Sequence, residues 1–176
     1  SLIQSNYHGF GSGHVPGNVG FVMQNRGTLF AMDENHHNRL EPNKRPFHTI
    51  IPAMVTRDGK PFLSFGVMGG DMQPQGHAQV LVNMIDHSMN VQAASDAARV
   101  RHDGSDTPTG DIMSDGGRLI VESGVSDEAL EELKKRGHNI SRGGSGGGYQ
   151  AIRIDFETGL LHGGSEARKD GAAIGY

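Results

Sequence analysis

A chain of 176 residues with a formal net charge of −4 has the length of a single domain and can bury a hydrophobic core. The slightly acidic balance gives no reason to propose nucleic acid or an anionic membrane surface as a partner. The absence of cysteine excludes disulfides and thiolate metal sites, and no apolar run approaches the roughly 20 residues that a membrane-spanning helix needs.

The chain opens without an initiator methionine or a signal peptide, and residues 1–5 have the pattern of a strand that begins upstream. We therefore expect a processed subunit, and both a cytoplasmic and an exported location stay open. A turn-rich loop with several glycines, residues 9–20, leads to a short apolar strand predicted at 21–25. The polar loop at 33–44 contains His36 and His37 and is a type of segment that often carries function.

The predicted fold is organised around the stretch 42–70. Asp58-Gly59 separates two apolar runs and predicts a tight hairpin turn, because a type I′ turn needs positive φ at both central residues. The second strand, predicted at 62–68, ends in Gly69-Gly70, and a helical pattern follows at 75–89. A strand that reaches a helix through two glycines can present unpaired backbone N–H groups to a phosphate or an oxyanion. The simpler interpretation, that the glycines only permit a sharp turn, stays open.

The second half of the chain alternates helices with short strands. Asn90 is predicted to cap a helix at 91–98, a strand follows at 119–122, and Ser126 is predicted to cap a helix that Gly137 ends. A glycine loop at 143–148 precedes a closing hairpin with strands at 149–156 and 160–164. Hairpins near both ends with helices between them predict an α+β fold.

The common catalytic and metal motifs are absent from the sequence. None of the ten histidines lies in a zinc-hydrolase helix pattern, so we expect no metal site and no cofactor. Gly144-Ser145-Gly146 is not a nucleophile elbow, because no apolar strand leads into it and no helix follows.

Several segments together resemble the small subunit of the γ-glutamyltranspeptidases, a family of N-terminal-nucleophile hydrolases. They are FGSG at 10–13, GFVMQN at 20–25, PNKRP at 42–46, the glycine pair at 69–70 and AAIGY at 172–176. The resemblance implies a four-layer αββα sandwich, of which this chain is the greater part of one subunit. It also implies the large subunit of the same precursor and a small amide as partners, with a cephalosporin-acylase-like branch as the nearest group.

In that family a threonine released by autocleavage attacks the substrate amide, and its own α-amino group acts as the base. By the resemblance this threonine lies about a dozen residues upstream of Ser1, so the isolated chain is expected to be inactive. Ser1 is a less favoured alternative nucleophile, because its aligned position lies inside the second strand.

The resemblance also assigns site residues. Ser5 aligns with a threonine whose hydroxyl bonds the nucleophile, and Gly69 and Gly70 align with the oxyanion-hole glycines. His48 and Thr49 replace two serines that contact the substrate carboxylate. Two further positions that line the substrate site are occupied here by Tyr7 and Arg26.

Leu29 is the departure that matters most, because it replaces an aspartate that holds the α-ammonium group of a glutamyl substrate. An unpaired buried charge is costly, and Arg26 instead offers a bidentate partner for a carboxylate. We therefore expect an amidohydrolase or acyltransferase that cleaves a γ-glutamyl or related carboxy-acyl amide. A strict γ-glutamyltransferase or glutathione hydrolase that uses Asp33, Glu34 or a residue of the other half of the precursor for the ammonium is one alternative. An inactive relative that acts as a binding or scaffold protein is another.

Overall fold

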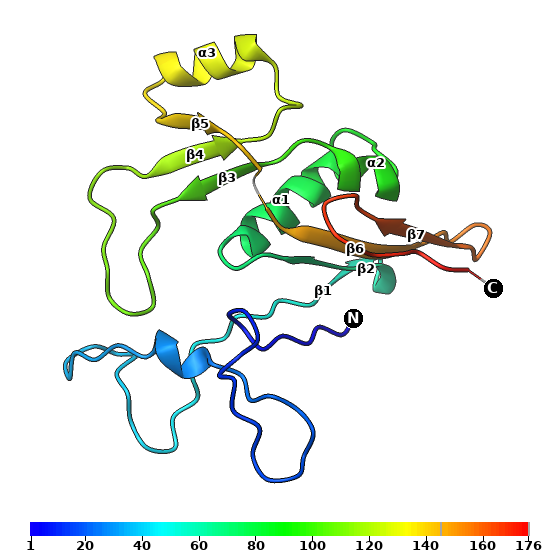
Figure 1. The fold of residues 1–176 in the computed structure, drawn as a ribbon. Helices are drawn as coiled ribbons and strands as arrows, with labels where there is room; N and C mark the ends of the chain where they lie inside the picture. The colour runs from blue at the N-terminus through cyan, green and yellow to red at the C-terminus, as the bar shows by residue number, and fades with distance from the viewer. Residues whose placement is uncertain (145, 176) are drawn as a thin grey trace. The chain divides into compact units, whose positions relative to one another are not determined.

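The computed structural model describes residues 1–144 and 146–175, which fall into two compact units (Figure 1). One unit contains Ser1–Leu2, Ile51–Asp103 and the described part of Gly117–Tyr176, and the other contains Ile3–Ile50 and Gly104–Gly116. The first unit holds the sheets and α-helices, whereas the second holds a single 3₁₀ turn, η1 (Arg26–Leu29), among its described residues. The interpretation of the chain as one domain stays a prediction.

The first unit is built on a four-stranded antiparallel sheet with the order β1-β2-β6-β7. Its strands are β1 (Ala53–Arg57), β2 (Lys60–Met68), β6 (Gly148–Ile154) and β7 (Leu161–Ser165). The predicted hairpin between β1 and β2 is confirmed, with φ of 51° at Asp58 and 75° at Gly59 as a type I′ turn requires. The predicted closing hairpin is confirmed as β6 and β7.

Two helices, α1 (Met72–Ile85) and α2 (Val91–Asp96), pack on this sheet and close its core (Figure 1). Alternate residues of β2, namely Leu63, Phe65 and Val67, turn toward the helices and are almost fully buried. Tyr149 of β6 is fully buried among them, and this burial raises the pKa of its hydroxyl. None of the helices in the described ranges has both the length and the apolar character to cross a membrane.

The helix boundaries differ from the predicted ones for local reasons. α1 begins at residue 72 rather than 75, because the carbonyls of Gly69 and Gly70 already accept the first helical N–H groups. It ends at residue 85 rather than 89, and Ser88 has a φ of 53° that no helix allows. The Asn90 cap is confirmed, because its side chain accepts the N–H groups of Gln92 and Ala93.

A second, three-stranded sheet has the order β3-β4-β5, with β3 (Val100–Asp103), β4 (Arg118–Val121) and β5 (Ile140–Arg142). The helix α3 (Asp127–Lys135) lies in the connection between the parallel strands β4 and β5. Parallel neighbours need such a crossover, which is usually helical. The predicted cap is confirmed, since the Ser126 hydroxyl accepts the N–H of Ala129. The sequence did not predict β3 and β5, which are only four and three residues long and carry charged residues.

Two predicted strands are wrong. Residues 1–5 and 21–25 have no strand pairing, and Phe21 is largely exposed. The second segment is held instead by single bonds, from the Met23 N–H to the His14 carbonyl and from the Ser12 N–H to the Met23 carbonyl. Of the predicted glycine loop at 143–148, Gly148 already belongs to β6, and Ser145 lies outside the described residues, as does Tyr176 at the end of the AAIGY segment.

Two glutamine side chains of α1 join the helix to the edge of β3. Gln79 Nε2 donates to the Val100 carbonyl at 2.8 Å, and its Oε1 accepts the Val100 N–H at 2.9 Å. Gln75, one helical turn earlier, makes the same pair of bonds with the backbone of His102. The i, i+4 spacing places both amides on one face of α1, where they act as a substitute strand for β3.

A buried charge network fixes the end of the chain against α2. Arg99 and Glu166 are almost fully buried and form an ion pair of 2.6 Å. Arg168 bonds both Glu166 and Glu122, and its pKa is raised chiefly by the hydrogen bonds that it donates to the Glu122 carboxylate. Removal of one partner from such a pair leaves a charge buried without compensation.

We therefore expect Glu166→Gln to lower the free energy of unfolding by about 3 kcal/mol or more, because the Arg99 guanidinium loses its counter-ion. Glu131→Gln is the matched control, since its ion pair with Lys134 is exposed and contributes less than about 0.5 kcal/mol. Urea denaturation of both variants measures the difference. If both variants lose equally little free energy of unfolding, the buried pair contributes no more to stability than the exposed one.

Candidate active site

Arg26 lies in the 3₁₀ turn η1 of the second unit and contacts three other predicted site residues. Its Nε donates to the Thr49 hydroxyl at 2.6 Å, and its Nη2 donates to the Ser5 carbonyl at 3.0 Å. The guanidinium carbon lies 5.9 Å from the centre of the Tyr7 ring, in the range of a cation–π contact. Arg26 is thus held in one orientation by two other segments of this unit, residues 5–7 and Thr49.

Tyr7 has an unusual backbone conformation. Its φ is 78°, which is uncommon for a residue with a side chain and is often found at functional sites. Its N–H donates to the Ser5 hydroxyl at 2.9 Å, and its ring stacks on His8 at 3.9 Å. His48, the remaining predicted residue of this unit, is exposed beside Thr49.

Leu29 lies three residues after Arg26 in the same 3₁₀ turn. Side chains at i and i+3 lie above one another in a 3₁₀ helix, so Leu29 and Arg26 project from the same side. Leu29 is half-buried, and its carbonyl accepts the Asn38 side-chain amide at 2.7 Å. The position that the resemblance reserves for an anion is therefore apolar, and it lies one 3₁₀ turn after the Arg26 cation.

Gly69 and Gly70, in the first unit, form the turn between β2 and α1, with φ of 131° and 60°. Their carbonyls point into the helix and accept the N–H groups of Met72 and Gln73 at 3.2 and 3.0 Å. The Gln73 side chain also donates to the Gly70 carbonyl at 3.2 Å. Neither glycine N–H donates to any residue that the structure describes. The turn therefore carries two backbone donors of the kind that stabilise an oxyanion.

Gly69 is also required by packing. A Cβ atom on it would lie 2.8 Å from the Cα of Gly147, a residue just before β6. A Cβ atom on Gly70 would meet nothing within 4 Å. Proline fits neither position, since its φ is fixed near −65°. Gly147 and Gln73 were not predicted from the sequence, because both act through contacts that only the folded turn creates.

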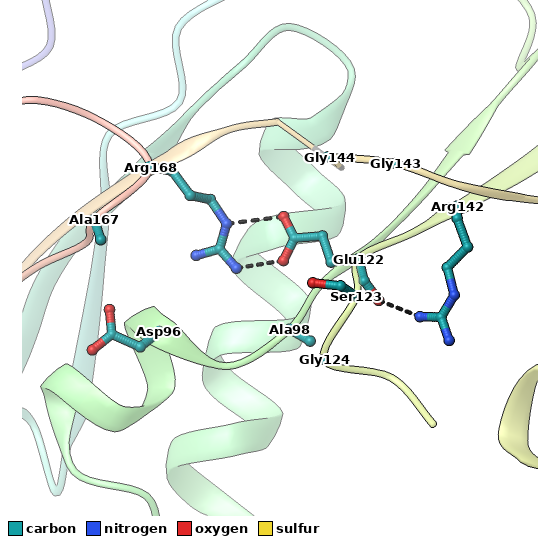
Figure 2. A pocket seen from close by; sticks show the side chains of 10 residues that line it. All are labelled: Asp96, Ala98, Glu122, Ser123, Gly124, Arg142, Gly143, Gly144, Ala167 and Arg168. Carbon is teal, nitrogen blue, oxygen red and sulfur yellow. Dashed lines mark hydrogen bonds and ion pairs between the residues drawn. The ribbon is translucent and has the colours of Figure 1, made fainter. Parts of the chain in front are cut away.

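A separate cleft of about 660 Å³ lies in the first unit, with Glu122, Arg142 and Arg168 among the residues that line it (Figure 2). Arg168 holds the Glu122 carboxylate through both oxygens, and Arg142 donates to the Glu122 carbonyl at 2.9 Å. Because these charged groups already satisfy one another, the cleft offers little for acyl-transfer chemistry. Within residues 1–144 and 146–175, no cluster of three His, Asp or Glu side chains has the geometry to hold a metal ion.

A family model for gamma-glutamyltranspeptidase matches residues 1–176, the full length of the chain. The chain belongs to the γ-glutamyltranspeptidase family. The glutathione hydrolase-like YwrD proenzyme of Bacillus subtilis is 41% identical over 179 residues, which cover 99% of this chain and 33% of that protein. The oxamate amidohydrolase proenzyme of Klebsiella pneumoniae is 32% identical and matches 100% of this chain and 33% of that protein. The chain thus spans about a third of these relatives.

Solved structures of the γ-glutamyltranspeptidase family agree with the fold. The cephalosporin acylase of Bacillus halodurans superposes with a TM-score of 0.83 at 44% identity, over 99% of this chain and 32% of that chain. The γ-glutamyltranspeptidase of Pseudomonas nitroreducens, in complex with L-DON, superposes with a TM-score of 0.81 at 26% identity, over 99% of this chain and 92% of that chain. These matches confirm the predicted family and the α+β fold of the N-terminal-nucleophile hydrolase type.

The geometry of the glycine turn predicts unequal effects of two alanine substitutions. Gly69→Ala should lower the free energy of unfolding by about 3 kcal/mol, because it adds backbone strain and a contact with Gly147. Gly70→Ala should cost only about 1 kcal/mol, since its φ of 60° is strained but its surroundings are open. Urea denaturation of the two variants makes the comparison. Equal destabilisation would show that the approach of Gly147 does not constrain the turn.

Proposed function

We propose that the complete protein is an amidohydrolase or acyltransferase that cleaves a carboxy-acyl amide through an acyl-enzyme intermediate. The fixed Arg26 guanidinium, with the apolar Leu29 in the same 3₁₀ turn, is the observation that carries this proposal. Membership of the γ-glutamyltranspeptidase family and relatives named oxamate amidohydrolase and cephalosporin acylase support the reaction class.

In this proposal the nucleophile is an N-terminal threonine upstream of residue 1. Its hydroxyl attacks the amide carbonyl while its own α-amino group takes the proton and passes it to the leaving amine. Water or an acceptor amine then attacks the acyl-enzyme. Ser5, whose hydroxyl already accepts the Tyr7 N–H at 2.9 Å, is proposed to donate its proton to the nucleophile and hold it in place.

The tetrahedral intermediate places a negative charge on the former carbonyl oxygen. We assign the N–H groups of Gly69 and Gly70 to this oxyanion, because their carbonyls are used by α1 and their N–H groups are not used by any described residue. Donors held in place by a folded turn need no reorganisation as the charge develops, which is why such donors lower the barrier.

The carboxylate of the acyl group is assigned to Arg26. Its Nε and Nη2 are engaged by Thr49 and Ser5, whereas its Nη1 bonds no acceptor among the described residues. A guanidinium fixed in this way can bind a carboxylate with little further loss of side-chain entropy. Thr49 and His48 are proposed to line the same subsite, with the Tyr7 ring on the face of the guanidinium.

The alternative of a strict glutathione hydrolase is favoured by the names of other relatives, such as the glutathione hydrolase proenzyme of Escherichia coli at 30% identity. It needs an anion for the substrate ammonium. Asp33 and Glu34 are the nearby candidates in sequence, but the Asp33 carboxylate already accepts the Asn35 N–H at 2.9 Å. An inactive scaffold is the remaining alternative.

The remainder of the same precursor is the proposed protein partner, as the word proenzyme in the names of the relatives suggests. Several large apolar side chains of the chain are at least 80% exposed, which is unusual for a surface that stays in water. They are Leu2, Phe10, Met32, Ile112 and Ile174.

A paired kinetic comparison tests the proposed substrate class. We expect the complete protein to hydrolyse glutaryl amides with a higher kcat/KM than γ-glutamyl amides, because Leu29 gives the extra ammonium no counter-charge. Leu29→Asp should raise kcat/KM for the γ-glutamyl amide relative to the glutaryl amide by about ten- to a hundredfold. Leu29→Asn is the matched control, because asparagine has the shape of aspartate without its charge.

The substrate preference of the native enzyme also distinguishes the two alternatives. A native enzyme that already prefers γ-glutamyl amides has another partner for the ammonium, which would support the glutathione hydrolase alternative. An enzyme that cleaves neither substrate would support the scaffold alternative.

A further inference from the structure

Among the residues that the structure describes, no strand pairs with the last residues of β2 on the side that faces β1. β1 pairs with β2 only from Arg57 to Ala53, which lies opposite Phe65. On the other side, β6 continues to pair with β2 as far as Met68. The end of β2 therefore extends beyond β1 just before the Gly69–Gly70 turn, and its backbone groups on that side need other partners.

His77 of α1 supplies one of these partners. Its Nε2 accepts the N–H of Val67 at 3.1 Å, and its ring lies 4.7 Å from the ring of Phe65, centre to centre. Val67 is fully buried, so its N–H would otherwise have neither strand nor solvent to bond. The imidazole takes the place that a strand would occupy.

The preceding residue of the helix makes this contact possible. A Cβ atom on Gly76 would lie 2.7 Å from Cγ1 of Val67, so only glycine allows α1 to lie this close to β2. Gly76 and His77, two consecutive residues of α1, thus both contact Val67 of β2. Between Val67 and the start of α1 lies only the short turn that contains Gly69 and Gly70, so the contact closes this turn at its base.

We propose that His77 is a positioning residue for acyl transfer, which holds the end of β2 so that the N–H groups of Gly69 and Gly70 keep the direction needed to bind the oxyanion. The inference rests on the proposed function, in which these two N–H groups stabilise the intermediate. A residue of this kind acts on the transition state, so its loss lowers kcat more than it raises KM.

The bond to Val67 requires the neutral imidazole, because Nε2 accepts a hydrogen bond only when the proton is on Nδ1. Burial lowers the pKa of His77 from its ordinary value of 6.5, which favours the neutral form near pH 7. Phe65 and Val67 of β2 are its recorded contacts, and within the described residues no hydrogen bond or ion pair joins it to a charged side chain.

The direction of the pH effect follows from that lowered pKa. When the pH falls below about 6.5, the unfolded chain binds the proton more readily than the folded one, so the stability that the His77–Val67 bond contributes is lost on the acid side. Protonated His77 would also direct a donor at the Val67 N–H. Turnover should decline as the pH falls through the lowered pKa of His77 in the folded protein, because protonation of the imidazole releases the turn.

Two substitutions separate positioning from simple packing in the complete protein. His77→Phe keeps an aromatic ring against Phe65 but has no acceptor, and we expect kcat for the better of the two amides to fall at least about tenfold at pH 8, with KM changed less than about threefold. His77→Gln places a non-titrating acceptor at a similar reach, and should restore most of kcat. His138→Phe, at an exposed histidine, is the matched control.

The pH profile and hydrogen exchange complete the test. The acid-side loss of kcat should disappear in His77→Gln, and amide protection at residues 67 and 68 should fall in His77→Phe but not in His138→Phe. An unchanged kcat in folded His77→Phe, or an unchanged acid-side profile in His77→Gln, would overturn the inference. If His77→Phe does not fold, the profile of His77→Gln decides. If the native protein cleaves neither amide, the proposed function fails, and exchange at residues 67 and 68 still shows whether His77 holds the end of β2.

Discussion

The close approach of α1 to the end of β2 is the constraint on which the first unit depends. Gly76 has no side chain that would prevent the contact, and the buried Val67 side chain packs against it. The turn that follows is also closely packed, because a Cβ atom on Gly69 would lie 2.8 Å from the Cα of Gly147. Close packing of this kind transmits small changes, because a core at native density has few voids into which a displaced group can move.

The chain uses polar side chains to replace missing strands at two places along α1. Gln75 and Gln79 bond the backbone of β3, and His77, between them in sequence, bonds the backbone of β2. One helix therefore joins both sheets of its unit through side chains that act as backbone substitutes. This arrangement satisfies backbone groups at strand ends, which would otherwise be costly to bury.

The parts of the fold that depend on neighbours in sequence could be predicted. The Asp58-Gly59 hairpin and the caps at Asn90 and Ser126 follow from rules that involve a few adjacent residues. The strands β3 and β5 could not be predicted in this way, because they are short and exist through their pairing with β4. His77 was also missed, since a histidine within a helical pattern shows no sign of the distant N–H that it accepts.

The candidate site was identified through the family resemblance rather than through local pattern. The sequence alone showed that Gly69-Gly70 precedes a helix, but the roles of Ser5, Tyr7 and Arg26 came from aligned positions. The structure adds that these three and Thr49 are joined by hydrogen bonds and a ring contact. Such a cluster draws residues from three separate segments, which no rule based on spacing could have assembled.

The central claim is that the fixed Arg26 guanidinium binds the carboxylate of the acyl group. A crystal structure of the complete protein with bound glutarate, the product acid, tests it most directly. We expect one carboxylate of the bound glutarate within about 3 Å of the Arg26 guanidinium. Glutarate bound with neither carboxylate in contact with Arg26 would contradict the claim.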